Sequence, residues 1–413
     1  MPGNARRMDG WTKGVVGCIV LASALGAVQR PSPPKSDPAA TWVKPQRGSL
    51  YVVSSDYTAQ SGQVLSVDPA AGRVTVLRTT AGYEPDIALS PDGSRLYVSY
   101  ILALQSRGVL EVIDTASGRV LYTFDDPDPW PSRSGAYLPR MVLSRDGQWL
   151  YLFKAKGGYE DRTYYVAVFD TQKGGFLPDV ATLQRCGPAG VLPGTDRHTL
   201  LVVCAESQNV ALLTLTERGG ARSPVSKVAV AGGNQFTENL VSAFLTRDGQ
   251  RAGVVKGDGT FATIDARSGR VLRRDAIDRA SRRLPASRDG WVAEAKRAAA
   301  ANAADWLAGR QIPLQIPAMS PDGSRVYLRT AAGKDARAVV DQVVALDTIS
   351  LAKVQTIPFR RPCVSVAVSD DGAWLYAVDM ENATLFVFDT ATGQETRAIV
   401  LPGSHPVYVV EAP

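Results

Sequence analysis

Histidine is almost absent from this chain. Only His198 and His405 occur among 413 residues, which is too few for a metal site built from imidazole ligands. The sequence also has no Cys-x-x-Cys-His haem attachment, no Gly-x-Ser-x-Gly turn and no phosphate-binding loop. We therefore expect no cofactor in this chain, and the commonest hydrolase and nucleotide-binding functions have no motif to support them.

Clusters of positive charge are missing as well. The 46 Lys and Arg residues slightly outnumber the 40 Asp and Glu residues, which gives a net charge of +6, but they are scattered along the chain. Nucleic-acid binding is indicated by basic residues gathered in one patch or run. The sequence therefore predicts no nucleic-acid partner.

The apolar stretch near the N-terminus is too short for an ordinary spanning helix. The uncharged run "GVVGCIVLASALGAV" at residues 14–28 falls short of the roughly 18 apolar residues that such a helix needs. Arg6, Arg7 and Lys13 precede the run and small residues end it, which is the order of an export signal. We expect residues 1–28 to be a signal peptide. The alternative is an uncleaved membrane anchor.

The expected signal divides the chain into three parts. Residues 29–47 follow it as a Pro-rich tether without hydrophobic periodicity. Residues 48–413 have the composition of a globular protein and are expected to form one repeat domain. The expected location is the periplasm or the extracellular space, with membrane contact only through an uncleaved N-terminus.

Cysteine is scarce, with four residues in all. Cys186 and Cys204 flank a segment with the pattern strand, turn, strand, and the turn lies near residues 195–196, so the two lie almost opposite each other across a hairpin. Because disulfides persist outside the cytoplasm, we predict a Cys186–Cys204 bond; two buried thiols are the alternative. Cys363 has no partner left and is expected to be a buried thiol.

The sequence does contain a repeat. The phrase "SPDGSRLYVSY" at residues 90–100 returns as "LSRDGQWLYLFKA" from Leu143, "LTRDGQRAGVVKG" from Leu245, "MSPDGSRVYLRT" from Met319 and "VSDDGAWLYAVDM" from Val368. Pro-Asp-Gly forms a tight turn, and the alternating run after it forms a strand. A second phrase, such as "EVIDTASGRVLYTF", ends a strand at Asp and reverses the chain at Gly.

Each repeat unit therefore holds four antiparallel strands, and a period of roughly 40–50 residues is that of a propeller blade. Seven units follow one another, near residues 50–78, 83–125, 137–183, 187–230, 239–276, 313–358 and 361–401. The first unit lacks its opening strand, and a spare strand, "HPVYVVEA" at residues 405–412, ends the chain. The sequence predicts an all-β, seven-bladed propeller closed by an N-/C-terminal strand swap, with one helical insert between blades 5 and 6.

The repeated phrases resemble those of YVTN-type seven-bladed propellers. More narrowly, the chain is similar to the heavy (beta) subunit of the quinoprotein amine dehydrogenases. That similarity is carried by the export signal, the Cys186…Cys204 hairpin, the Asp-Gly-Trp insert before the sixth blade, and the runs "VVALDTISLAKVQTI" and "VSDDGAWLYAVDMENATLFVFDTATGQETRAIVLPGSHPVYVV". The resemblance implies a scaffold, with the tryptophan-derived quinone in a separate light subunit docked on the propeller. Four cysteines are too few for that disulfide-dense light subunit itself.

Connections opposite the Asp-Gly turns vary in length, which is typical of a binding face. The long ones span residues 125–137, 154–165, 231–239, 277–312 and 329–342. Within the largest, Trp291 and Trp306 belong to an apolar stripe at helical spacing. We interpret this helix as packed on its own propeller or, with Trp130 of another loop, as a docking site for a protein partner. The alternative for the whole face is that these solvent-exposed loops vary in length without a binding function.

Residues just before each first strand approach the central channel. They are Glu84, Asp86, Arg140, Arg185, Glu238, Arg360, Arg361 and His405. Such acids and arginines can clamp a carboxylate or phosphate, or they are solvated charges at the channel mouth. The expected function is an exported binding or scaffold protein of amine-dehydrogenase heavy-chain type. The alternative is a lactonase-like hydrolase that uses Glu84, Asp86 or Glu238 with a divalent cation.

Overall fold

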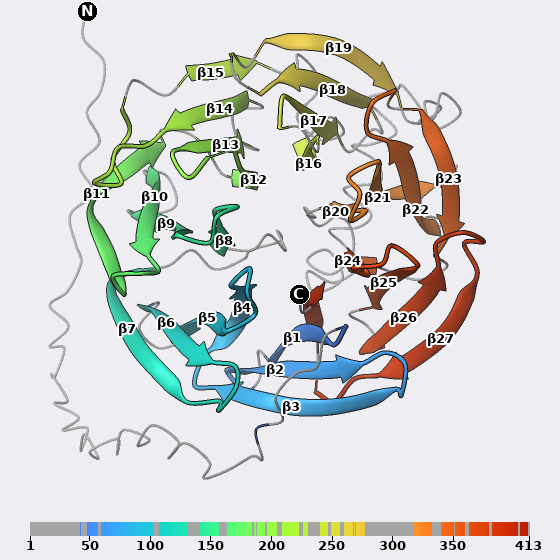
Figure 1. The fold of residues 1–413 in the computed structure, drawn as a ribbon, viewed down its shortest axis with the longest axis horizontal. Coiled ribbons are helices and arrows are strands. Elements are labelled where there is room, and N and C mark those ends of the chain that lie inside the picture. The colour runs from blue at the N-terminus through green and yellow to red at the C-terminus, as the bar shows by residue number, and fades with distance from the viewer. Residues whose placement is uncertain are drawn as a thin grey trace, which may run out of the picture. The chain divides into compact units, whose positions relative to one another are not determined.

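The computed structural model describes most of the chain from Trp42 onward (Figure 1). The described residues are 42, 48–56, 59–102, 107–129, 141–156, 163–183, 186, 188–194, 196–204, 209–222, 226–229, 240–246, 249–256, 260–266, 268, 270–276, 317–332, 340–350, 352–359, 363–379, 382–403 and 405–411. They belong to one compact unit, Ala39–Pro413; the other unit, Met1–Pro38, lies outside the described residues. The expected signal peptide, the tether apart from Trp42, and the helical insert of residues 277–312 therefore also lie outside them.

The strands form seven four-stranded antiparallel sheets, the blades, which surround a common centre (Figure 1). From the innermost strand outward, blade 1 consists of β28 (Pro406–Glu411), β1 (Leu50–Asp56), β2 (Ser61–Asp68) and β3 (Arg73–Thr80). Blade 2 consists of β4 (Tyr83–Leu89), β5 (Arg95–Leu102), β6 (Arg107–Asp114) and β7 (Val120–Pro129). Blade 3 consists of β8 (Met141–Leu143), β9 (Trp149–Lys156), β10 (Thr163–Asp170) and β11 (Gly175–Leu183).

The remaining four blades repeat this order. Blade 4 consists of β12 (Pro188–Pro193), β13 (Thr199–Cys204), β14 (Asn209–Thr214) and β15 (Ser226–Ala229). Blade 5 consists of β16 (Leu240–Leu245), β17 (Arg251–Lys256), β18 (Thr260–Asp265) and β19 (Val271–Ala276). Blade 6 consists of β20 (Ala318–Met319), β21 (Arg325–Ala332), β22 (Val340–Asp347) and β23 (Lys353–Pro358). Blade 7 consists of β24 (Cys363–Val368), β25 (Trp374–Asp379), β26 (Thr384–Asp389) and β27 (Glu395–Val400). The all-β, seven-bladed propeller is confirmed.

The C-terminal strand closes the ring. β28 pairs with β1 in antiparallel fashion, with Val409 opposite Val52 and Glu411 opposite Leu50. The pairing joins both ends of the propeller in one sheet, as the sequence predicts, and covers the inner edge of β1. The buried side chains of Val52 and Val409 also pack with Val378 of blade 7, so the closing blade contacts the last complete one.

The Asp-Gly turns are held by their own side chains. In blade 2 the Asp92 carboxylate accepts hydrogen bonds from the Ser90 hydroxyl at 2.6 Å and from the Ser94 amide at 3.0 Å. Gly93 has a φ of 68°, in the left-handed region that favours glycine. These hydrogen bonds, chiefly the one from Ser90, lower the pKa of Asp92 to about 2. The same serine-to-aspartate bond recurs at Asp146, Asp322 and Asp371.

Neighbouring blades pack through a tyrosine near the start of the second strand. It recurs in five blades as Tyr51, Tyr97, Tyr151, Tyr327 and Tyr376, each packed among residues of the next blade. In blade 5 the matching residue is Gly253. The ring of Phe244 on β16 occupies the space, since a Cβ on Gly253 would lie 2.2 Å from that ring. In blade 4 the matching residue is Leu201, which packs with residues of blade 5. A large apolar side chain, though not always a ring, therefore fills this place between the blades.

The cysteines behave as predicted. Cys186 and Cys204 form a disulfide, and both are fully buried. Cys363, at the start of β24, is a free buried thiol. Because disulfides persist in oxidising compartments, the bond indicates such an environment. Among the described residues, no helix is both long and apolar enough to cross a membrane.

The antiparallel blades place their connections on two faces. The first-to-second and third-to-fourth connections lie on one face, which we call the turn face. The second-to-third connections and those between blades lie on the opposite face, which we call the loop face. In blades 2 to 7 every first-to-second connection has five residues, as at residues 90–94 and 369–373. The first-to-second turns are therefore uniform in length, whereas the third-to-fourth connections of this face range from residues 69–72 to residues 215–225.

The connections on the loop face vary in length. Its connections range from residues 81–82, between β3 and β4, to residues 277–317, between β19 and β20. The contrast between uniform turns and variable loops is the one that the sequence predicts. Three of the predicted long loops are shorter than expected because a strand continues into them: β7 runs to Pro129, β9 to Lys156 and β21 to Ala332.

Candidate functional site

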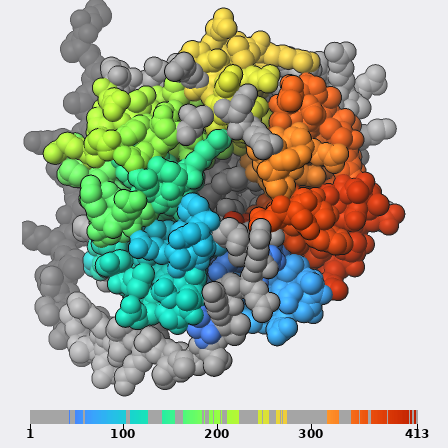
Figure 2. Space-filling view, viewed as in Figure 1, coloured from blue at the N-terminus to red at the C-terminus, as the bar shows by residue number. Residues whose placement is uncertain are grey.

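The structure describes part of the predicted channel mouth. Glu84, Asp86 and His405 are described: the two acids lie on β4 of blade 2, whose blue atoms border the hollowed centre in Figure 2, and His405 precedes β28 of blade 1. The other predicted channel residues lie outside the described residues: Arg140, Arg185, Glu238, Arg360 and Arg361. The predicted docking tryptophans also lie outside them: Trp130, Trp291 and Trp306.

Glu84 and Asp86 lie at a bulge in β4, the innermost strand of blade 2. The pairing of β4 with β5 is irregular between Tyr83 and Asp86, on either side of Pro85. Glu84 has a φ of 51°, which is uncommon for a residue with a long side chain. Bulges re-aim side chains, and such backbone strain is frequent beside functional sites. The bulge therefore marks the start of β4 as a candidate site.

Both acids are buried in the wall of the ring. Glu84 is 2 % exposed and Asp86 is 0 % exposed. The Glu84 amide donates a hydrogen bond to Ser55 Oγ at 2.9 Å, and Asp86 Oδ1 accepts one from the Ile87 amide at 3.0 Å. Ser99 lies directly opposite Asp86 on β5, and its buried hydroxyl has no partner among the described residues. These two acids are therefore not solvated charges.

His405 belongs to the same wall. It precedes β28, has a φ of 55°, and is exposed. Its carbonyl accepts a hydrogen bond from the Ser55 amide at 3.1 Å, so Ser55 contacts both His405 and Glu84. The fold thus brings together residues from the two ends of the propeller. The sequence gives no signal for Ser55, because a serine inside a strand has no distinctive pattern.

A half-buried ion pair joins blades 1 and 2 farther out, between β3 and β6. Arg78 on β3 donates two hydrogen bonds to Glu111 on β6, with Nη2 2.6 Å from Oε1 and Nε 3.0 Å from Oε2. The Tyr100 hydroxyl on β5 donates to the same carboxylate at 3.2 Å. Burial, and then the nearby Glu111 charge, raise the pKa of Tyr100, so its hydroxyl remains a donor. Such a bidentate contact ties the outermost strand of blade 1 to blade 2.

Two of the three acids of the expected cation site, Glu84 and Asp86, are described and lie in this wall. Among them, no group of three or more His, Cys, Asp and Glu side chains is close enough to hold a metal ion. The third acid of the expected set, Glu238, lies outside the described residues.

The chain matches no family model and no curated protein, but its fold matches solved structures. The periplasmic gluconolactonase of Pseudomonas aeruginosa has a TM-score of 0.57 at 16% identity, covering 89% of this chain and 100% of that one. Hydrazine synthase of Kuenenia stuttgartiensis has a TM-score of 0.53 at 17% identity, covering 85% and 98%. A functionally unknown protein of Desulfotomaculum acetoxidans has a TM-score of 0.59 at 13% identity, covering 88% and 98%. At these identities the likeness shows the propeller fold alone.

Proposed function

We propose that this protein is exported and acts as a binding or scaffold propeller, whose loop face is a platform for a partner subunit. The arrangement is that of the amine-dehydrogenase heavy chain, in which the propeller carries a separate subunit. The chain itself then needs no complete catalytic site, because the partner brings the chemistry.

The contrast between the two faces supports this proposal. The turn face keeps five-residue first-to-second connections in six blades, whereas the loop face contains connections as different as residues 81–82 and 277–317. Rigid scaffolds place their binding residues on such variable loops. The buried Cys186–Cys204 disulfide supports export, because it persists in an oxidising compartment.

Co-purification tests the platform. A tagged full-length chain should retain a protein partner, and Trp130→Ala or the double change Trp291→Ala, Trp306→Ala should release it by removing large apolar contacts. Tyr122→Ala is the matched control, because Tyr122 is an aromatic residue 49% exposed on the outer strand β7. Equal retention by the loop-face variants and by the control would contradict docking on the loop face.

A lactonase-like activity is the second candidate, favoured by the position of Glu84 and Asp86. The two carboxylates lie on one bulge of an innermost strand, and a periplasmic gluconolactonase shares the fold. With a divalent cation added, the chain would then hydrolyse a gluconolactone, and Glu84→Gln or Asp86→Asn would abolish turnover. Asp379→Asn, which alters a fully buried acid of blade 7, should leave turnover unchanged. A folded chain without lactone turnover would exclude this candidate.

A further inference from the structure

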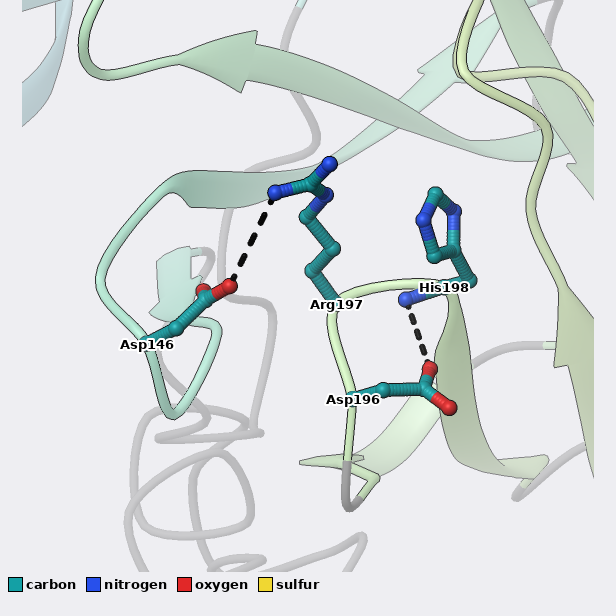
Figure 3. A pocket seen from close by; sticks show the side chains of 4 residues that line it. All are labelled: Asp146, Asp196, Arg197 and His198. Carbon is teal, nitrogen blue, oxygen red and sulfur yellow. Dashed lines mark hydrogen bonds and ion pairs between the residues drawn. The ribbon is translucent and has the colours of Figure 1, made fainter.

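Side chains on the turn face bridge neighbouring blades. Between blades 3 and 4, Arg197 Nη1 lies 4.0 Å from Asp146 Oδ2 across a small pocket (Figure 3). Between blades 2 and 3, Arg95 Nη1 donates a hydrogen bond to the Thr171 carbonyl at 2.6 Å. At both junctions the bridging groups belong to the two blades that they join.

One bridging position recurs in the outermost strands. It is the third residue of the strand, whose side chain lies close to the glycine in the third-to-fourth connection of the next blade. The pairs are Tyr122 with Gly174, Gln355 with Gly393, and Arg397 with Gly72. Arg397 Nη1 also donates a hydrogen bond to the Pro69 carbonyl at 2.9 Å. This arginine therefore both covers the glycine and binds the backbone of the same turn.

The junction between blades 1 and 2 is bridged from outside the blades. The third residue of β3 is Thr75, which has a short side chain. The three atoms nearest to a Cβ on Gly118 belong instead to Trp42, at 2.3 to 2.7 Å. Trp42 Nε1 donates a hydrogen bond to the Thr115 carbonyl at 2.9 Å, which follows the last aspartate of the third strand as does the carbonyl that Arg397 binds. Trp42 thus makes both contacts that Arg397 makes one junction earlier.

The slot that holds the indole is fixed by bonds within blade 2. The Gly118 amide donates to the Asp114 carbonyl at 2.8 Å, and the Thr115 hydroxyl donates to the Gly93 carbonyl at 2.6 Å. Gly118 has a φ of 71°, in the left-handed region that favours glycine. The half-buried Trp42 ring also packs against the core cluster that blades 1 and 2 share. The slot therefore suits an indole by its shape and by its acceptor.

We propose that this slot is the docking site of the tether, residues 29–47, and that Trp42 fixes the face from which the tether leaves the propeller. Thr115 and Gly118 lie on the turn face, so the chain before Trp42 starts on the side opposite the loop face. The folded domain then begins at Trp42 rather than at residue 48. That the loop face is thereby left open for a partner subunit rests on the proposed function, whereas the docking of Trp42 does not.

Trypsin cleavage of the full-length protein measures the docking. Arg47 lies between Trp42 and the start of β1, whereas Lys35 precedes Trp42 in the chain. Docking holds the chain on both sides of Arg47, so the cleavage rate there follows the undocked fraction. Cleavage after Lys35 is the internal reference. We expect Trp42→Ala to raise the Arg47-to-Lys35 rate ratio about tenfold, because a hydrogen bond and the packing of a large ring are lost.

Matched substitutions separate docking from general stability. Gly118→Ala should raise the ratio as Trp42→Ala does, because the new Cβ would lie 2.3 Å from the indole. Gly72→Ala introduces the same backbone strain at a φ of 69°, but its Cβ would lie 3.8 Å from the nearest neighbour and should leave the ratio unchanged. Tyr122→Ala removes the corresponding ring at the next junction and should also leave it unchanged.

A conservative variant keeps the test decisive if Trp42→Ala does not fold. Trp42→Phe retains a ring and loses the N–H donor, so its ratio should lie between those of the unaltered protein and Gly118→Ala. In a Trp42→Phe background, Gly118→Ala should bring the ratio to that of Gly118→Ala alone, because either ring is expelled. An unchanged ratio in the Trp42 and Gly118 variants, or an equal rise in Gly72→Ala, would overturn the proposal.

Cross-linking tests the face on which the tether docks. Lys44 is two residues from Trp42, and Lys173 lies in the third-to-fourth turn of blade 3 with its side chain 79% exposed. Lys156 ends β9 on the loop face. An amine-reactive reagent should join Lys44 to Lys173 but not to Lys156, and the product should decrease in Trp42→Ala. A Lys44–Lys156 product, or no Lys44–Lys173 product, would overturn the docking. The co-purification test of the loop face does not involve Trp42, so either proposal can fail without the other.

Discussion

Removal of the Cys186–Cys204 disulfide is expected to destabilise blade 4 strongly. The bond ties the segment just before β12 to the end of β13, which pair with each other along Pro188–Pro193. Both cysteines belong to the core cluster that blades 3 and 4 share, together with Tyr151 and Leu200. A double change to alanine removes the cross-link and alters only one paired residue of the hairpin, Cys204, which lies opposite Pro188.

The magnitude follows from the loop that the bond closes. The two cysteines are 18 residues apart in sequence. A cross-link over that distance lowers the conformational entropy of the unfolded chain, which raises the free energy of unfolding by about 3 kcal/mol at room temperature. Both side chains are fully buried, so their truncation to alanine adds roughly 1 kcal/mol each from lost packing. We expect the unfolding free energy to fall by about 5 kcal/mol in the double variant.

Urea unfolding, followed by tryptophan fluorescence, measures this change. Cys363→Ala is the control, because Cys363 is equally buried but forms no disulfide; it reports the packing loss of one cysteine, with one weak bond to the Ser365 carbonyl. After subtraction of two such losses, about 3 kcal/mol should remain for the cross-link. Reduction of the unaltered protein should give a similar value. A residual below about 1 kcal/mol would refute the cross-link as a stabilising element of the hairpin.

Three further perturbations test the ring, a blade contact and a turn. Removal of residues 405–411 exposes the inner edge of β1, so we expect association on size-exclusion chromatography; a folded monomer would contradict the closure. Gly253→Val should lower the unfolding free energy by roughly 1–3 kcal/mol, because the new side chain meets Phe244. Phe244→Leu should recover part of that loss in urea titrations, and additive effects would argue against the contact. Asp92→Asn should reduce the amount by which the free energy of unfolding falls as the pH is lowered. The folded pKa of Asp92 is depressed to about 2, so its contribution is present above the unfolded pKa of about 4 and is lost as the pH falls through the folded pKa. An unchanged slope of stability between these values would refute that role.

The backbone of the ring could be predicted from the sequence because the repeats contain turn residues whose side chains fix the local backbone. Asp92-Gly93 specifies its turn through bonds to residues two positions away, and the serine-to-aspartate bond recurs at Asp146, Asp322 and Asp371. The closure was predictable for a related reason: one strand was missing at the start of the repeat and one was left over at its end. The hairpin disulfide followed from the turn between its cysteines.

Contacts between blades could not be predicted in the same way. Ser55 contacts Glu84 and His405 only because the closed ring brings three distant segments together. Trp42, in the expected tether, donates a hydrogen bond to the Thr115 carbonyl at 2.9 Å and packs on Gly118 of blade 2. Neither contact has a pattern along the chain, because the residues that meet are separated by whole strands.

The turn between β12 and β13 shows how the turn face can change its side chains without a change in the ring. The fold demands a five-residue connection in blade 4, and residues 194–198 keep that length. Asp196 and Tyr151 supply the bonds that hold the backbone there, so this turn keeps its length without the Asp-Gly pair of the other blades. The loop face, in contrast, varies in the length of its connections. Binding on the loop face should therefore respond to insertions and deletions in its connections, whereas changes in the first-to-second turns should act through single side chains at constant length.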